Sequence, residues 1–493
     1  MTISLPFDNS YARLDGPFFT RTKPTPVVAP RLVRLNLALA EELGLDADAL
    51  ASPEGLAALA GAAIPDGAEP IAAAYAGHQF GHFSPQLGDG RAILLGEVID
   101  RAGRRRDIQL KGSGPTPFSR GGDGRAALGP VLREYLVSEA MAALGVPTTR
   151  ALAAVTTGEH VMREDIHPGA VLTRVAASHI RVGTFQFFAA RRDLASLRKL
   201  ADYAIARHDP AAAGAPNPYL AFFEGVVRRQ ADLVAQWLLL GFIHGVMNTD
   251  NMSVSGETID YGPCAFMDAY DPATVFSSID RQGRYAYGAQ AGIAQWNLAR
   301  LVEALLPLFG EDENKAVADA QGALDAYVDR FNASYLAGLR RKLGLTTEGP
   351  DDLALASALL SLMTADRVDF TVLFRRLCDL AADPEASGPV RDMFMDLAGV
   401  DAWLARWRDR LTSEPAVAPA ERASAMRRAN PAFIPRNHLV ERMIEAAVER
   451  QDFAPFEELL RILARPYDDQ PEFAAYAEAP PPSPQNYVTY CGT

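Results

Sequence analysis

The sequence predicts an α+β fold in which a β-rich half precedes a helix-rich half. Two short strand-like runs, residues 91–99 and 106–111, are joined by a polar stretch typical of a hairpin turn, and a further β-rich run covers 150–165. After Leu194 the spacing of apolar residues becomes helical, most clearly over 219–245. Strands that are followed by helices, rather than alternating with them, favour an α+β architecture.

The composition is that of a globular protein with sizeable cores. The chain has 493 residues, 48% hydrophobic residues and a formal net charge of −13. This acidic balance argues against nucleic acid or a membrane surface as a partner, and we interpret the one basic run, 104–106, as a solvated turn before a strand. No signal peptide is visible, and three cysteines cannot form a disulfide framework. We therefore expect a cytoplasmic protein, and we expect it to be a monomer.

The change in character along the chain divides it into four segments. We predict an N-terminal extension over 1–70, a β-rich lobe over 71–190, a helical lobe over 191–478 and a Pro-rich, extended tail over 479–493. Within these segments, helical patterns cover 30–60, 129–145, 219–245, 293–309, 315–343, 351–381 and 437–464. The helix over 129–145 has Pro130 in its first turn and Gly145 at its end, which are favourable positions for both residues.

The segment HGVMNTDN, residues 244–251, is similar to the catalytic loop of a protein kinase, H-R-D-L-x-x-x-N. His244 and Asn251 have the spacing of that pattern, but Val246 occupies the position of the catalytic Asp. An Asp occurs four residues later, at Asp250, directly before Asn251. The segment therefore indicates a kinase-like site whose candidate base has moved next to a candidate metal ligand.

A second metal ligand is predicted at Asp260, which begins the sequence DYG. This sequence resembles the kinase D-F-G, whose Asp binds Mg²⁺. We expect residues 252–259 to form a tight hairpin with Gly256 at its turn, so that Asn251 and Asp260 offer oxygen ligands to Mg²⁺ or Mn²⁺ from neighbouring strand ends. Each piece alone is compatible with a cap or a turn, but their combination after a long helix favours a metal site.

Lysine and arginine residues upstream of this loop could neutralise phosphates. Lys111 ends a strand that precedes a helix with two glutamates, Glu134 and Glu139, an order similar to the kinase Lys–Glu ion pair. Glu134 is the preferred partner because it lies near the start of the helix. Arg174 and Arg181 are seven residues apart, so we expect them on one side of a short helix. Paired arginines there suit bidentate phosphate contacts.

Two glycine clusters, residues 86–91 and 112–125, flank the strand that carries Lys111. Glycines allow backbone N–H groups to approach phosphate oxygens closely, although many such stretches are ordinary surface loops. His78 and His82 have the i, i+4 spacing of zinc ligands, but no third ligand with matching spacing is evident, so a zinc site is not expected.

These motifs resemble those of the selenoprotein O family, the SelO or YdiU-like proteins. The similar stretches include YAGHQFGHFSPQLGDGRAILLGE, DIQLKGSGPTPFSRGGDGRAALGPVLREYL and GFIHGVMNTDNMSVSGETIDYGPCAFMD, and the resemblance spans nearly the whole chain. It implies a protein-kinase-like bilobal fold with family-specific extensions. It also implies an enzyme that binds ATP in a flipped orientation and transfers AMP, with release of pyrophosphate, to Ser, Thr or Tyr hydroxyls of proteins.

The resemblance also implies roles for individual residues. Asp250 would accept the proton, Asn251 and Asp260 would hold Mg²⁺ or Mn²⁺, and Lys111 with Glu134 would orient the phosphates. The residues that would line the nucleotide site are Gly88, Gly90, Arg91, Lys111, Asp123, Gly124, Arg174, Arg181 and Asp260. Three alternatives stay open, namely uridylyl transfer from UTP with Mn²⁺, an atypical phosphotransferase, and a non-catalytic nucleotide-binding scaffold.

The C-terminus departs from the family pattern. Eukaryotic members end in Cys-x-x-selenocysteine, whereas this chain ends Cys491-Gly492-Thr493, so only the cysteine remains. A redox role of Cys491 would need a partner, and Cys264, four residues after Asp260, is the nearest candidate.

Overall fold

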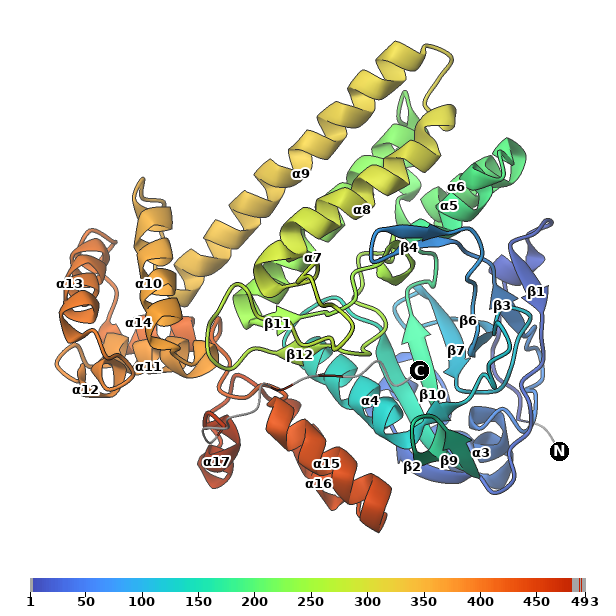
Figure 1. The fold of residues 1–493 in the computed structure, drawn as a ribbon, viewed down its shortest axis with the longest axis horizontal. Coiled ribbons are helices and arrows are strands. Elements are labelled where there is room, and N and C mark those ends of the chain that lie inside the picture. Colours follow the sequence, from blue (N-terminus) through green and yellow to red (C-terminus); the bar gives the residue numbers. More distant parts are fainter. Residues whose placement is uncertain (1–2, 481–486, 488, 490–493) are drawn as a thin grey trace.

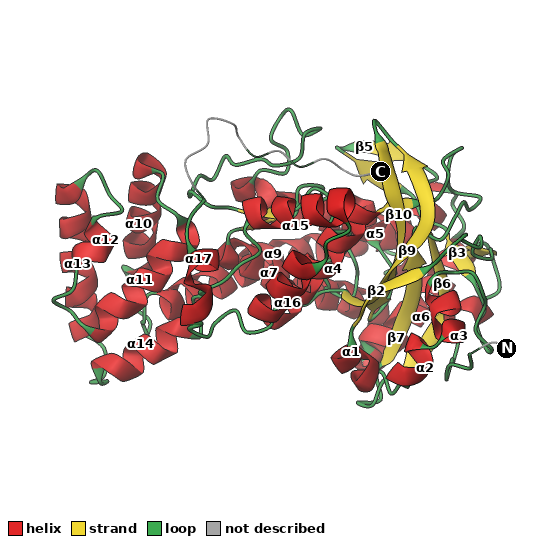
Figure 2. Ribbon diagram, turned by 90° about the horizontal axis from the view of Figure 1, so that it is seen from below, coloured by secondary structure: helices red, strands yellow, loops and turns green. Residues whose placement is uncertain are grey.

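The structure is a computed structural model that describes residues 3–480, 487 and 489. As predicted, it combines one large sheet with many helices, and most of the helices lie to one side of the sheet (Figures 1 and 2). The likeness to a kinase fold and the four-segment division stay predictions. Cys491 and most of the Pro-rich tail lie outside the described residues.

The main sheet is antiparallel and places three side chains of the site on one face. Its strands, in spatial order, are β1 (Phe19–Arg21), β3 (Ile71–Ala73), β6 (Ala92–Ile99), β7 (Arg105–Lys111), β10 (Ile166–Ala176), β9 (Arg150–Met162) and β2 (Arg31–Leu35), with the short β8 (Ala126–Ala127) paired to β10. The β6–β7 hairpin and β9 fall where the sequence predicts them. In the register of β10 against β7, Arg174 lies opposite Gln109, two residues from Lys111. Because side chains alternate along a strand, Lys111, Gln109 and Arg174 share one face of the sheet.

The helices occupy most of the predicted stretches, some of which are divided. They are α1 (Leu37–Glu42), α2 (Ala47–Ala51), α3 (Pro53–Leu59), α4 (Leu128–Ala143), α5 (Val182–Ala190), α6 (Leu194–His208), α7 (Pro218–Leu240), α8 (Gln290–Leu305), α9 (Glu313–Lys342), α10 (Asp352–Asp366), α11 (Phe370–Ala382), α12 (Gly388–Arg391), α13 (Leu397–Thr412), α14 (Pro419–Arg427), α15 (Asn437–Arg450), α16 (Ala454–Leu463) and α17 (Ala474–Ala477). The prediction was wrong at the start of the stretch 30–60, where residues 31–35 form strand β2, and further helices, such as those over 182–190 and 397–412, lie outside the predicted stretches. Within the described residues, no helix is long and apolar enough to cross a membrane.

Helix α7 stops before the kinase-like loop instead of running into it. Gly241 adopts a positive φ of 73°, the left-handed conformation that commonly ends helices. The two-residue strand β11 (Phe242–Ile243) follows and pairs with β12 (Ala265–Phe266). The loop of the site, 244–264, is therefore held at both ends by one short antiparallel pair.

Helix α4 is the element that connects the sheet to the C-terminal helices. Its buried Leu132 and Leu136 share a core with Met443 of α15 and Phe456 of α16, and the ring of Tyr135 packs edge-on against Phe456 at 5.5 Å between centroids. A second core unites α10, α11, α13 and α14 at the end of the molecule far from the sheet (Figure 1). The rigid packing of α4 fixes the position of Glu134 relative to β7.

The basic run 104–106 matches the predicted solvated turn only at Arg104, which is exposed and directly precedes strand β7. Strand β7 begins at Arg105, and all three arginines pair with carboxylates. Asp100 alone accepts from Arg104 at 2.9 Å and from Arg106 at 3.2 Å. The prediction was wrong for Arg105 and Arg106, which belong to the strand, because their acidic partners lie in the turn of the hairpin or in distant segments.

We predict that Arg436→Met destabilises the fold by about 3–5 kcal/mol, measured by urea denaturation, because it leaves a buried carboxylate without its cation. The buried Arg436 donates to Asp268 and Asp369, each at 2.6 Å. Adding Asp369→Asn should restore part of the stability, since Asn can still accept from the backbone N–H of Val372 at the start of α11. Equal stability of the single variant and the parent would contradict this account.

Candidate functional site

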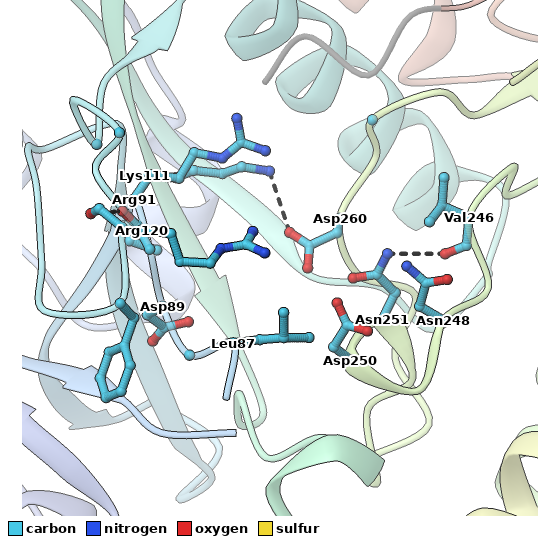
Figure 3. Close-up of a pocket in the computed structure, with 18 of the residues that line it drawn as sticks. Leu87, Asp89, Arg91, Lys111, Arg120, Val246, Asn248, Asp250, Asn251 and Asp260 are labelled. Atoms are coloured by element: carbon cyan, nitrogen blue, oxygen red, sulfur yellow. Dashed lines mark hydrogen bonds and ion pairs between the residues drawn. The ribbon is translucent and has the colours of Figure 1, made fainter. Parts of the chain in front are cut away.

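A cavity of about 910 Å³ separates the sheet from the kinase-like loop. Lys111 and Arg120 lie on the sheet side, Asp250 and Asn251 lie on the opposite side, and Asp260 lies between them (Figure 3). The lining includes Gly88, Gly90, Arg91, Lys111, Asp123, Gly124, Arg174, Arg181, Asp250, Asn251 and Asp260. The structure thus brings together every residue predicted for nucleotide, metal and proton transfer.

Asp260 is the centre of a buried charge network. Its carboxylate accepts from Arg174 and Arg181 at 2.6 Å each and from the Lys111 ammonium at 3.3 Å. Burial alone would raise the pKa of Asp260, but Arg174, Arg181 and Lys111 outweigh it and hold this pKa well below its usual range. Three cations therefore meet at one carboxylate on the wall of the cavity.

The backbone of Asp260 adopts a conformation that few residues other than glycine tolerate, with φ of 63°. The preceding residue, Ile259, is fixed by a hydrogen bond, because its carbonyl oxygen lies 2.8 Å from Nε2 of the buried His244. The ring of His244 stacks on Trp237 at 5.4 Å between centroids. The histidine of the kinase-like motif is therefore a support for Asp260 and does not line the cavity.

Arg174 and Arg181 are not on one helix, as their spacing suggested. Arg174 belongs to β10, whereas Arg181 caps the start of α5, after a turn. Their guanidinium groups nevertheless converge, since both bond to Asp260. The helix prediction was wrong because a spacing of seven also fits a strand end and a helix start joined by a turn.

Lys111 has the glutamate partner that was preferred from the sequence. Its ammonium lies 2.5 Å from Glu134, which also accepts from Arg174 at 3.2 Å. The other candidate, Glu139, instead holds Arg150 at 2.8 Å. The position of Glu134 on α4, five residues before Glu139, thus determines which of the two glutamates pairs with Lys111.

Asp250 is a buried carboxyl with few donors. One oxygen accepts from Gln79 at 3.2 Å, and the other lacks a hydrogen-bond donor within the part of the chain that the structure describes. Burial raises the pKa of Asp250 to about 6, with partial compensation from its own backbone N–H and from Arg181. The group is a stronger base than an ordinary carboxylate and still ionises near neutral pH.

Residues 252–259 do not form the expected hairpin, although Gly256 has the positive φ of a turn. The two arms pair with different neighbours: Met252 and Val254 bond to the start of α5, and Thr258 bonds to Pro147. The hairpin prediction failed because the short segments on either side of a turn do not show which other segments they will form hydrogen bonds with. Asn251 and Asp260 still reach the same cavity.

The donor set around Asn251 and Asp260 suits a hard divalent cation. The Asn251 amide nitrogen donates to the Val246 carbonyl at 3.0 Å, which directs the amide oxygen toward Asp260 (Figure 3). Among the described residues, no group of three His, Cys, Asp or Glu side chains forms a closed metal cage. Mg²⁺ is commonly held by one or two protein oxygens together with substrate phosphates, so the residues fit a cation that binds with a nucleotide.

The glycines of the site are explained mainly by packing. A Cβ on Gly88 would lie 2.3 Å from the ring of Phe118, and one on Gly124 would lie 2.1 Å from the Gly114 carbonyl. The Asp123 carboxylate forms an ion pair with Arg163 at 2.9 Å, and this contact lowers the pKa of Asp123. These contacts shape the rim of the cavity on the sheet side.

Four residues of the site were not selected from the sequence. Gln109 accepts from Arg174 at 2.6 Å, and Arg181 lies 4.8 Å above the ring of Tyr75. The other two are Asp89, buried 3.9 Å from Arg181, and Gln79 beside Asp250. The shared strand face of Gln109 and Lys111 was the one available signal, since the other contacts join distant segments.

Comparison with known proteins agrees with this geometry. A family model described as "Protein adenylyltransferase SelO" matches residues 1–464. Proteins named "Protein nucleotidyltransferase YdiU" are similar throughout: 68% identity with that of Methylorubrum populi over 499 residues, 67% with that of Methylorubrum extorquens, and 65% with that of Bradyrhizobium diazoefficiens. Each alignment covers 100% of both chains. With a family model over most of its length and such relatives, the chain belongs to the SelO family.

Proposed function

We propose that this protein is a metal-dependent adenylyltransferase with a protein-kinase-like fold, which transfers AMP from ATP to Ser, Thr or Tyr hydroxyls of proteins. The observation that carries the proposal is the convergence of Lys111, Arg174 and Arg181 on Asp260, opposite the buried Asp250. The names of the family and of its members, an adenylyltransferase and protein nucleotidyltransferases, support the same chemistry.

The three cations suit the two phosphates that leave. A triphosphate attacked at its α-phosphorus releases pyrophosphate, on which negative charge accumulates as the bond to the α-phosphorus breaks. Arg174 and Arg181 are buried and positioned before the nucleotide binds, so they stabilise this charge without a cost of reorganisation in water.

Asp250 is the proposed proton acceptor. The hydroxyl oxygen of the substrate protein attacks the α-phosphorus, the bond from that phosphorus to the α–β bridging oxygen breaks, and the hydroxyl proton passes to Asp250. Its raised pKa of about 6 improves it as a base at neutral pH. Asn251 and Asp260 would hold Mg²⁺ or Mn²⁺, which, when bound, neutralises the phosphate oxygens.

The alternatives differ in what is transferred. UTP in place of ATP would use the same phosphate site, and a phosphotransferase would attack the γ-phosphorus. A non-catalytic scaffold explains the arrangement of the site least well, because a scaffold does not need a base with a raised pKa beside a pair of metal ligands.

The distinguishing experiment supplies the protein and a mixture of cell proteins with Mg²⁺ or Mn²⁺ and ATP labelled on the α- or the γ-phosphate. Adenylyl transfer predicts protein labelling from α-labelled ATP alone. Label from γ-labelled ATP would mean a kinase, and α-labelled UTP tests the uridylyl alternative. Absence of label from all three nucleotides would contradict the proposed function.

We predict that Asp250→Asn lowers the transfer rate by about 10²–10⁴-fold, because it removes the proton acceptor but keeps the shape of the side chain. Nucleotide affinity, measured by calorimetry with a non-hydrolysable ATP analogue, should change little. A parental transfer rate in this variant would show that Asp250 is not the base.

We predict that Asp260→Asn abolishes the stimulation of transfer by Mg²⁺ or Mn²⁺ and strengthens the binding of metal-free ATP severalfold. The reason is that the variant loses a metal ligand and frees three cations from their shared carboxylate. Titration of ATP with and without a chelator measures both effects.

Glu134→Gln is the matched control for this prediction. It also removes a negative charge beside Lys111 and Arg174, but Glu134 is not a proposed metal ligand. Metal stimulation should persist in Glu134→Gln. The same loss in both variants would assign the effect to charge balance and reject Asp260 as a ligand.

A further inference from the structure

A cationic and aromatic surface borders the cavity on the side of Asp250. We call it the acceptor face and define it by the hairpin of β4 (Gly77–Gln79) and β5 (His82–Ser84), the loop 279–285, and Trp296 and Arg300 of α8. Phe83 and Ile279 are exposed in it, by 41% and 56%. Gln79, Phe80 and Ile279 line both this face and the cavity, so the two are continuous.

Aromatic rings in contact with guanidinium groups form the centre of the acceptor face. The half-buried Trp296 has Arg284 at 4.8 Å and Arg300 at 5.0 Å from its ring centre. The ring of His78 packs edge-on against Trp296 at 5.2 Å and lies 4.9 Å from Phe83. Stacking of this kind holds a guanidinium group in one place while leaving its N–H groups available.

The charge of this face is only partly neutralised. Arg300 pairs with Glu303, whereas Arg281 and Arg284 have no ion pair with any residue that the structure describes. The nearby Asp280 is buried and accepts from the backbone N–H groups of Arg284 and Tyr285. In a chain with a net charge of −13, two such arginines beside the site form a local positive patch.

The acceptor face is coupled to the proposed base by direct hydrogen bonds. The backbone N–H of His78 donates to Thr249 at 2.7 Å, and the side chain of Gln79 donates to Asp250 at 3.2 Å. Asn248 accepts from the Phe80 backbone at 3.0 Å and from the Tyr285 hydroxyl at 2.7 Å. A chain lying on this face would therefore be presented to Asp250.

We propose that the acceptor face binds the segment of the substrate protein that carries the target hydroxyl, and that it selects segments with acidic side chains near that hydroxyl. This inference rests on the proposed function. Arg284 and Arg281 supply the charge complementarity, which gives specificity in protein recognition. The exposed Phe83 and Ile279 supply apolar contact on either side.

The test uses two defined acceptors, a random Glu–Tyr copolymer and a random Lys–Tyr copolymer, with α-labelled ATP. The parent should label the Glu–Tyr copolymer preferentially. Arg284→Glu should lower kcat/KM for that copolymer about tenfold, mainly through KM, because attraction becomes repulsion. Since the Arg284 guanidinium group has no acidic partner, its replacement leaves no buried carboxylate unpaired.

Arg461→Glu is the matched control, since Arg461 also stacks on an aromatic ring, Phe473, at 4.7 Å, but on α16 away from the cavity. It should retain the parental preference. Equal labelling of the two copolymers, or an equal effect of both variants, would contradict the proposal that the acceptor face selects acidic segments.

Failure of the proposed function gives a different result. If α-labelled ATP labels mixed cell proteins or the enzyme itself but not the Glu–Tyr copolymer, the proposed role of the acceptor face is rejected and the proposed adenylyl transfer is kept. No label on any protein would reject the proposed function and this inference with it.

Discussion

The site depends on the balance between one carboxylate and three cations. Arg174, Arg181 and Lys111 all contact Asp260, and no other carboxylate of the site pairs with as many cations among the residues that the structure describes. Without these cations, burial would make the charged form of Asp260 costly, and without Asp260 the buried arginines would repel one another. The three cations and Asp260 therefore compensate one another's charge in a buried site.

This balance also gives the cations two alternative partners. In the structure they contact Asp260, and in the proposed complex the phosphates take over part of that role. Glu134 pairs with Lys111 and Arg174 in the structure, and we expect these ion pairs to persist in the complex. On the other side of the cavity, the hairpin of β4 and β5 bonds to residues 248–250. The proposed nucleotide and acceptor sites thus meet at Asp250.

Local patterns predicted much of the fold, and together with the family resemblance they selected residues that the structure places around one cavity. The β6–β7 hairpin, helix α4 and the preference for Glu134 followed from alternation, helical period and position in the helix. The same local patterns could not predict contacts between distant segments. Examples are the contact of Gln79 with Asp250 and the pairing of residues 252–259 with α5 and Pro147. The spacing of Arg174 and Arg181 suggested a helix, because spacing alone does not encode a turn between two elements.

The most direct test is a crystal structure of the protein with Mn²⁺ and an ATP analogue that has a methylene group between its α- and β-phosphates. We predict that Lys111, Arg174 and Arg181 contact the β- and γ-phosphates and that the α-phosphorus faces Asp250. A structure in which the γ-phosphorus lies nearest to Asp250, with the arginines still bound only to Asp260, would contradict this prediction.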